Sequence, residues 1–109
     1  MDLSKKDKKA AREIIEKGLQ KEMAQGLDDF YIILNSWREK KSDNLDAYHQ
    51  LYKKITKFDT HISRRYDYVT GSRYLLTVSA LLYDDVISEC DLSCFSEEVR
   101  EYLIKIKNF

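Results

Sequence analysis

The sequence contains no proline and only three glycines among its 109 residues. Average usage would give roughly five prolines and seven to eight glycines in a chain of this length. Proline breaks the interior of a helix and glycine weakens it, so their scarcity favours helix along almost the whole chain. Because so short a chain can bury only one modest core, we expect residues 1–109 to form a single helical domain.

A long apolar run is also missing. The longest mostly apolar stretch, residues 74–83, is about half as long as a membrane span, and the first residues are charged, unlike a secretory signal. These absences predict a cytoplasmic protein that does not contact membranes. In that compartment the two cysteines, Cys90 and Cys94, are expected to be reduced thiols.

The chain has no excess charge of either sign. Nineteen basic residues balance nineteen acidic ones, so the net charge is zero. Proteins that bind nucleic acid usually carry a strongly basic domain, so nucleic acid is the less favoured kind of partner. Any electrostatic binding site must therefore be local.

No residue pattern points to catalysis, to a metal or to a cofactor. His49 and His61 are twelve residues apart, which on one helix separates them by about 18 Å along the axis, so they cannot share a metal within one chain. Cys90 and Cys94 sit among acidic residues, whereas a reactive thiolate needs a positive neighbour. A glycine-rich phosphate loop is absent. We therefore expect no catalytic residues, no metal, no cofactor and no enzymatic activity.

Apolar residues three and four positions apart predict a long first helix, from about Lys5 to Lys40, with Ser4 as its N-cap. From Ile15 onward its apolar residues form one stripe. Residues 1–12 are polar, so we expect them to fray or to extend beyond the bundle. A second copy of the chain could shelter this helix, which predicts a homodimer through the first helix.

Three further helices follow from the same spacing. The polar turn 40–44 supplies the N-cap of a helix that reaches about residue 69, a third helix covers about 73–88, and Ser96 caps the last one. Gly71 suits the left-handed position that follows a helix. The third helix is apolar on more than one side and should be the most buried. Together these patterns predict an all-α, up-and-down bundle of about four helices with a long N-terminal helix.

Two glycines lie inside the first predicted helix, and each costs up to about 1 kcal/mol relative to alanine. Gly26 falls within the apolar stripe. Close approach of another helix, a kink or a tolerated defect would each account for it. The sequence leaves the three explanations open.

The second helix carries a basic surface. With a step of 100° per residue, seven side chains lie nearly opposite its apolar stripe. They are Lys53, Lys54, Lys57, His61, Arg64, Arg65 and Tyr68, and we call them the basic ridge. Such a surface can bind phosphates or an acidic protein partner, and it can equally be a solvated or ion-paired face of the helix.

Asp59 borders the apolar stripe of the same helix, so it is expected to need a partner. Arg73, just past the turn, is the candidate, and the pair would be structural because no second carboxylate is spaced to work with Asp59 in catalysis. The sequence thus predicts a small non-enzymatic protein-interaction or assembly module. The alternative is a nucleic-acid-associated regulatory protein that uses the basic ridge.

Overall fold

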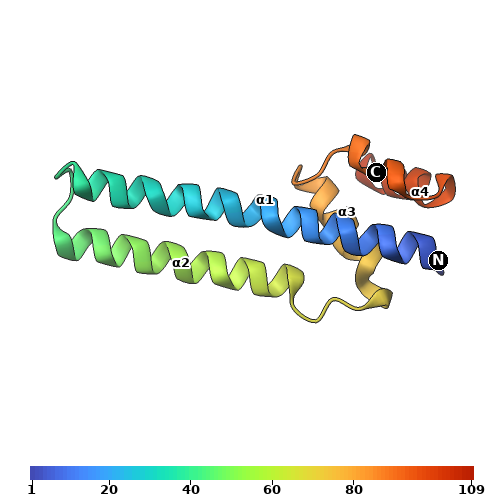
Figure 1. Ribbon diagram of the computed structural model, residues 1–109, viewed down its shortest axis with the longest axis horizontal. Coiled ribbons are helices and arrows are strands. Elements are labelled where there is room, and N and C mark those ends of the chain that lie inside the picture. Colours follow the sequence, from blue (N-terminus) through green and yellow to red (C-terminus); the bar gives the residue numbers. More distant parts are fainter. The chain divides into compact units, whose positions relative to one another are not determined.

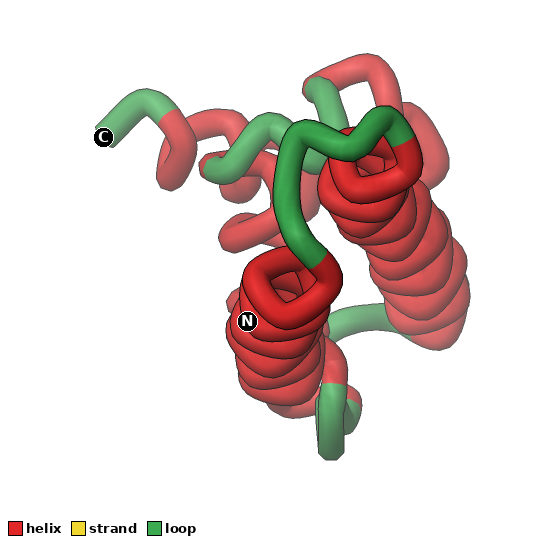
Figure 2. Tube along the Cα trace, turned by 90° about the vertical axis from the view of Figure 1, so that its left-hand side faces the viewer, coloured by secondary structure: helices red, strands yellow, loops and turns green.

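The computed structural model describes all 109 residues and is all-α (Figure 1). The four α-helices are α1 (Lys5–Arg38), α2 (Asn44–Tyr66), α3 (Tyr74–Tyr83) and α4 (Glu97–Lys107), and the two short 3-10 helices are η1 (Gly71–Arg73) and η2 (Glu89–Cys94). No residue lies in a strand (Figure 2). The predicted all-α helical bundle with a long N-terminal helix is confirmed.

Capping side chains lie at the helix starts that the sequence predicts. The Ser4 hydroxyl accepts a hydrogen bond of 3.1 Å from the Asp7 backbone N–H at the start of α1. Asp43 is the N-cap of α2 and Ser96 is the N-cap of α4. Each oxygen satisfies a backbone N–H that has no partner within the first turn of its helix, which is why these residue types mark helix starts.

The helix ends differ from the predictions. α2 stops at Tyr66 because Asp67 turns to extended backbone, and Tyr68 then takes the left-handed conformation at φ 60°. The prediction that Gly71 occupies the left-handed position is wrong, since no glycine has a positive φ and Gly71 instead opens η1. α3 likewise ends at Tyr83, about five residues early, ahead of Asp85 at φ 58°.

The chain divides into two compact units that share α1. Residues 1–21 and 68–109 form one, which we call the core unit, and residues 22–67 form the other, which we call the hairpin unit.

The core unit holds almost all of the buried apolar side chains. α3 has the largest buried fraction of any helix, as predicted, since four of its ten residues are buried: Thr77, Val78, Leu81 and Leu82. From α1, Ala10, Ala11 and Ile14 are buried. Residues 1–12 were expected to fray or to extend beyond the bundle, but Ala10 and Ala11 pack within the core unit. Small alanine side chains allow close packing without the large apolar residues on which that expectation was based.

Asp7 ties the start of α1 to the start of α4. It is buried, and its carboxylate accepts hydrogen bonds of 2.8 Å from both the backbone N–H and the hydroxyl of Ser96, and one of 3.1 Å from the Ser4 hydroxyl. Burial alone would raise the pKa of Asp7, but these hydrogen bonds outweigh it and hold the pKa below its ordinary value. With this many donors, and with the positive charge of Lys6 nearby, the buried carboxylate stays ionised.

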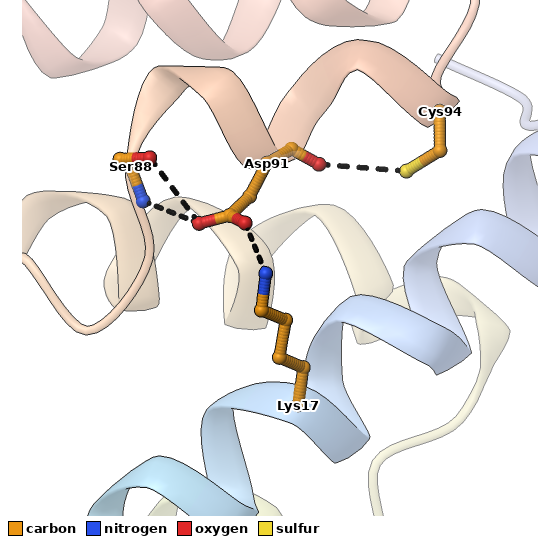
Figure 3. A network of polar contacts seen from close by, with 4 residues as sticks. All are labelled: Lys17, Ser88, Asp91 and Cys94. Atoms are coloured by element: carbon orange, nitrogen blue, oxygen red, sulfur yellow. Dashed lines mark hydrogen bonds and ion pairs between the residues drawn. The ribbon is translucent and has the colours of Figure 1, made fainter.

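A second polar network joins α1 to η2 (Figure 3). Lys17 donates to Asp91, whose other carboxylate oxygen accepts a 2.8 Å hydrogen bond from the Ser88 backbone N–H. The Cys94 thiol donates to the Asp91 carbonyl at 3.5 Å. Both cysteines are free thiols, and burial together with nearby carboxylates raises the pKa of Cys94.

We expect this network to make the protein sensitive to acid. The hydrogen bonds from Lys17 and Ser88 lower the pKa of Asp91 to about 2. Because the folded pKa lies below that of an unfolded aspartate, the stabilisation is present above about pH 4 and is lost as the pH falls toward about 2. Asp91→Asn should remove on the order of 1 kcal/mol of this pH-dependent stability, since Lys17 is half exposed and screened.

The measurement is the free energy of unfolding by urea between pH 2 and pH 7. Asp28→Asn, which changes an exposed carboxylate in the hairpin unit, is the matched control. Parallel pH profiles for the wild type and Asp91→Asn would contradict the assignment.

Candidate interaction surface

In the hairpin unit, α2 runs antiparallel to the second half of α1 (Figure 1). The helices approach closely at Gly26, where an added Cβ atom would lie 2.4 Å from Cζ of Phe58. The Phe58 ring also meets Phe30 edge to face, with 5.6 Å between the ring centroids. Of the three explanations for Gly26, close approach of another helix is therefore confirmed.

A polar cluster links α1 to α2 at the end of the hairpin that is farther from the turn. Oε1 of Glu22 lies 2.6 Å from His61 Nε2 and accepts a 3.0 Å hydrogen bond from Arg65, while Oε2 accepts one from the Tyr66 hydroxyl. Burial would raise the pKa of Glu22, but the three hydrogen bonds outweigh it and lower the pKa. Burial and the neighbouring carboxylate raise the pKa of Tyr66.

Two of the seven residues of the basic ridge belong to this cluster. His61 and Arg65 contact Glu22, and only 13% of the Arg65 side chain is exposed, so the prediction that both arginines face away from the packed side of α2 is wrong for Arg65. A single-helix projection could not reveal this, because the carboxylate lies 43 residues away in the sequence. The other ridge residues are exposed: Lys53, Lys54, Lys57, Arg64 and, beyond the end of α2, Tyr68.

The exposed part of the ridge borders a depression of about 580 Å³. Its lining comes from α2 alone and consists of Thr56, Lys57, Thr60, His61, Arg64 and Arg65. The binding role of these residues stays a prediction. Asp59 is exposed, so burial does not require it to have a charged partner. Arg73 belongs to the core unit, and the pairing of Asp59 with Arg73 stays a prediction.

The hairpin unit exposes large apolar side chains on both helices. Eight of them form what we call the hairpin face: Met23, Leu27, Tyr31 and Leu34 of α1 and Leu45, Tyr48, Tyr52 and Ile55 of α2. Their exposed fractions run from 37% for Met23 to 66% for Tyr31. Ile32 is also exposed, but the helical repeat puts it on another side of α1. Tyr48 and Tyr52 stack on one another in the open, with 6.4 Å between their ring centroids.

Helix geometry puts both sets on the same side of the hairpin. With a step of about 100° per residue, the α1 set is centred about 90° from the side that carries Gly26 and Phe30, and the α2 set is centred about 90° from the side that carries Ala47 and Phe58. Both rotations have the same sense, and because the helices are antiparallel they lead to the same side. The exposed lysines Lys53 and Lys57 are turned toward the other side.

Most of these residues belong to the apolar stripes from which the sequence predicts a buried core. The width of the stripe on α1 is a sign of this exposure: counted at 100° per residue it spans about 120°, and a single neighbouring helix covers only part of so wide a stripe. In the hairpin unit only Gly26 and Ala47 are buried.

No α-helix combines the length and the apolar character of a membrane span. No group of three or more histidine, cysteine, aspartate or glutamate side chains is placed to hold a metal ion. No protein-family model, curated protein or solved structure matches the chain.

Proposed function

We propose that the protein is a small, cytoplasmic, non-enzymatic interaction or assembly module that binds its partner through the hairpin face. The observation that carries this proposal is the set of eight large apolar side chains exposed on one side of two helices. The largest apolar patch of a typical monomer is roughly 300–600 Å² and often functional. Three exposed tyrosines alone supply about half of that or more, since each ring has 150–250 Å² of surface.

The packing of the hairpin unit supports the same proposal. Two helices in isolation need a buried apolar stripe between them, yet only a glycine and an alanine of this unit are buried. A partner that covers the hairpin face would supply the missing core. From the sequence we expected a homodimer through α1, and residues 23–34 are the part of α1 that leaves apolar side chains exposed.

Photo-crosslinking tests the use of this face without assuming a partner. A benzophenone amino acid replaces Tyr52 in the hairpin face, and in the matched control it replaces Lys53, which is exposed on the other side of the same helix. In the cells from which the protein comes, we expect a protein adduct from position 52 and none from position 53. The absence of an adduct at position 52, or equal adducts at both positions, would overturn the proposal.

A second candidate function is nucleic-acid-associated regulation through the basic ridge. The observation that favours it is the depression beside Lys57 and Arg64, whose cations can bind phosphates or an acidic protein surface. Binding of a short DNA or RNA duplex, measured against salt concentration, tests it. A steep loss of affinity with rising salt supports phosphate contacts, and no binding at low salt removes this candidate.

A further inference from the structure

We infer that the partner on the hairpin face is a second copy of this chain, so that two hairpins pack face to face as a four-helix bundle. This inference rests on the proposed function and names the partner. Three properties of the hairpin unit carry it: the area of its apolar face, its charge and the arrangement of its helices.

The apolar area of the hairpin face is comparable to what each partner contributes to a stable dimer interface. A standard interface covers about 800 Å² on each partner. Tyr31, Tyr48 and Tyr52 are each exposed by about two thirds, which gives roughly 300–500 Å² together. The five aliphatic side chains, exposed by 37–65%, bring the hairpin face toward the size of one half of such an interface.

The charges favour a second copy over a lipid surface. None of the eight residues of the hairpin face is charged. The two exposed charged residues that the same projection puts on this side, Arg38 and Asp59, have opposite signs, so the face carries no excess charge that would repel a second copy. The hairpin unit, residues 22–67, contains eight basic and eight acidic residues, which gives a net charge of zero. An anionic membrane would therefore exert no net attraction on it, whereas helices that lie on such membranes are rich in lysine and arginine.

The arrangement of the helices is that of half a bundle. In a four-helix bundle each helix contacts two neighbours and buries a stripe wider than a single contact needs. In the hairpin unit each helix has one neighbour, met through Gly26, Phe30 and Phe58, and a second apolar surface about 90° away. A two-fold axis in the plane between two packed hairpin faces puts the same surface on both sides of the interface. Two-fold symmetry is the commonest symmetry of soluble oligomers.

Light scattering of the purified full chain at several concentrations tests the inference. We expect twice the chain mass of 13.0 kDa at tens of micromolar, falling toward one chain mass on dilution. Leu27→Glu should raise the dimer dissociation constant at least about 100-fold, because it places a charge in the apolar interface. The matched control is Leu76→Glu, which puts the same charge on an equally exposed leucine of the core unit and should leave the dimer intact.

The melting temperature adds a readout that remains useful if Leu27→Glu loosens the hairpin. For a dimer it rises with protein concentration, and for a monomer it does not. We expect this rise for the wild type and for Leu76→Glu, and its loss for Leu27→Glu. A single chain mass at every concentration would overturn the inference, as would a dimer that Leu27→Glu leaves unchanged. A monomer that still gives an adduct with another protein from position 52 would leave the proposed function standing.

Discussion

Leu81→Ala is expected to lower the free energy of unfolding by about 2–5 kcal/mol. Leu81 lies on α3 in the middle of the core unit, and none of its surface is exposed. Truncation removes the transfer free energy of the lost methyl and methylene groups and leaves a cavity that closely packed neighbours only partly fill. Urea unfolding followed by circular dichroism measures the change.

Leu76→Ala is the matched control, because Leu76 lies on the same helix and is 63% exposed. Its effect should stay within about 0.5 kcal/mol, as for most surface substitutions. Equal losses for the two leucines would mean that α3 does not bury the side that the structure assigns to the core.

Gly26→Ala is expected to lower the free energy of unfolding by about 1–3 kcal/mol, the usual cost of overpacking. In an open helix this substitution stabilises by up to about 1 kcal/mol, so the expected sign is reversed here. The reason is steric, since the added Cβ would meet three atoms of the Phe58 ring at 2.4–2.8 Å. Moving the ring aside would disturb its edge contact with Phe30.

Two further variants check the steric explanation by the same urea unfolding. Gly71→Ala has open space around the added Cβ and no left-handed backbone to strain, so it should be neutral or stabilise by about 0.4–1 kcal/mol. In a Phe58→Leu background the cost of Gly26→Ala should shrink, because the clashing ring is gone. An unchanged cost in that background would contradict the close approach of α2 at Gly26.

The helix starts could be predicted because their causes are local. Ser4, Asp43 and Ser96 each cap a helix by accepting a hydrogen bond from a residue three positions later. Apolar residues at spacings of three and four then mark one side of each helix. Even the close approach at Gly26 had a local sign, a glycine inside an apolar stripe, although its cause lies in Phe58 of the other helix.

Helix ends and contacts of single side chains could not be predicted in the same way. Gly71 carries the usual sign of a helix end, yet the left-handed turn falls at Tyr68, so the residue type best suited to that conformation does not occupy it. Arg65 points toward Glu22 rather than toward solvent, and nothing near Arg65 in the sequence indicates this.

The sequence by itself determined that the chain is helical and which side of each helix is apolar, because backbone propensity, capping and periodicity act over a few residues. Only the tertiary structure decided which apolar sides are covered. The alanines near the start of α1 are buried, whereas Leu27 and Tyr52 are exposed. Burial depends on what lies opposite a residue, and those neighbours come from distant parts of the chain or, as we infer for the hairpin face, from a second chain.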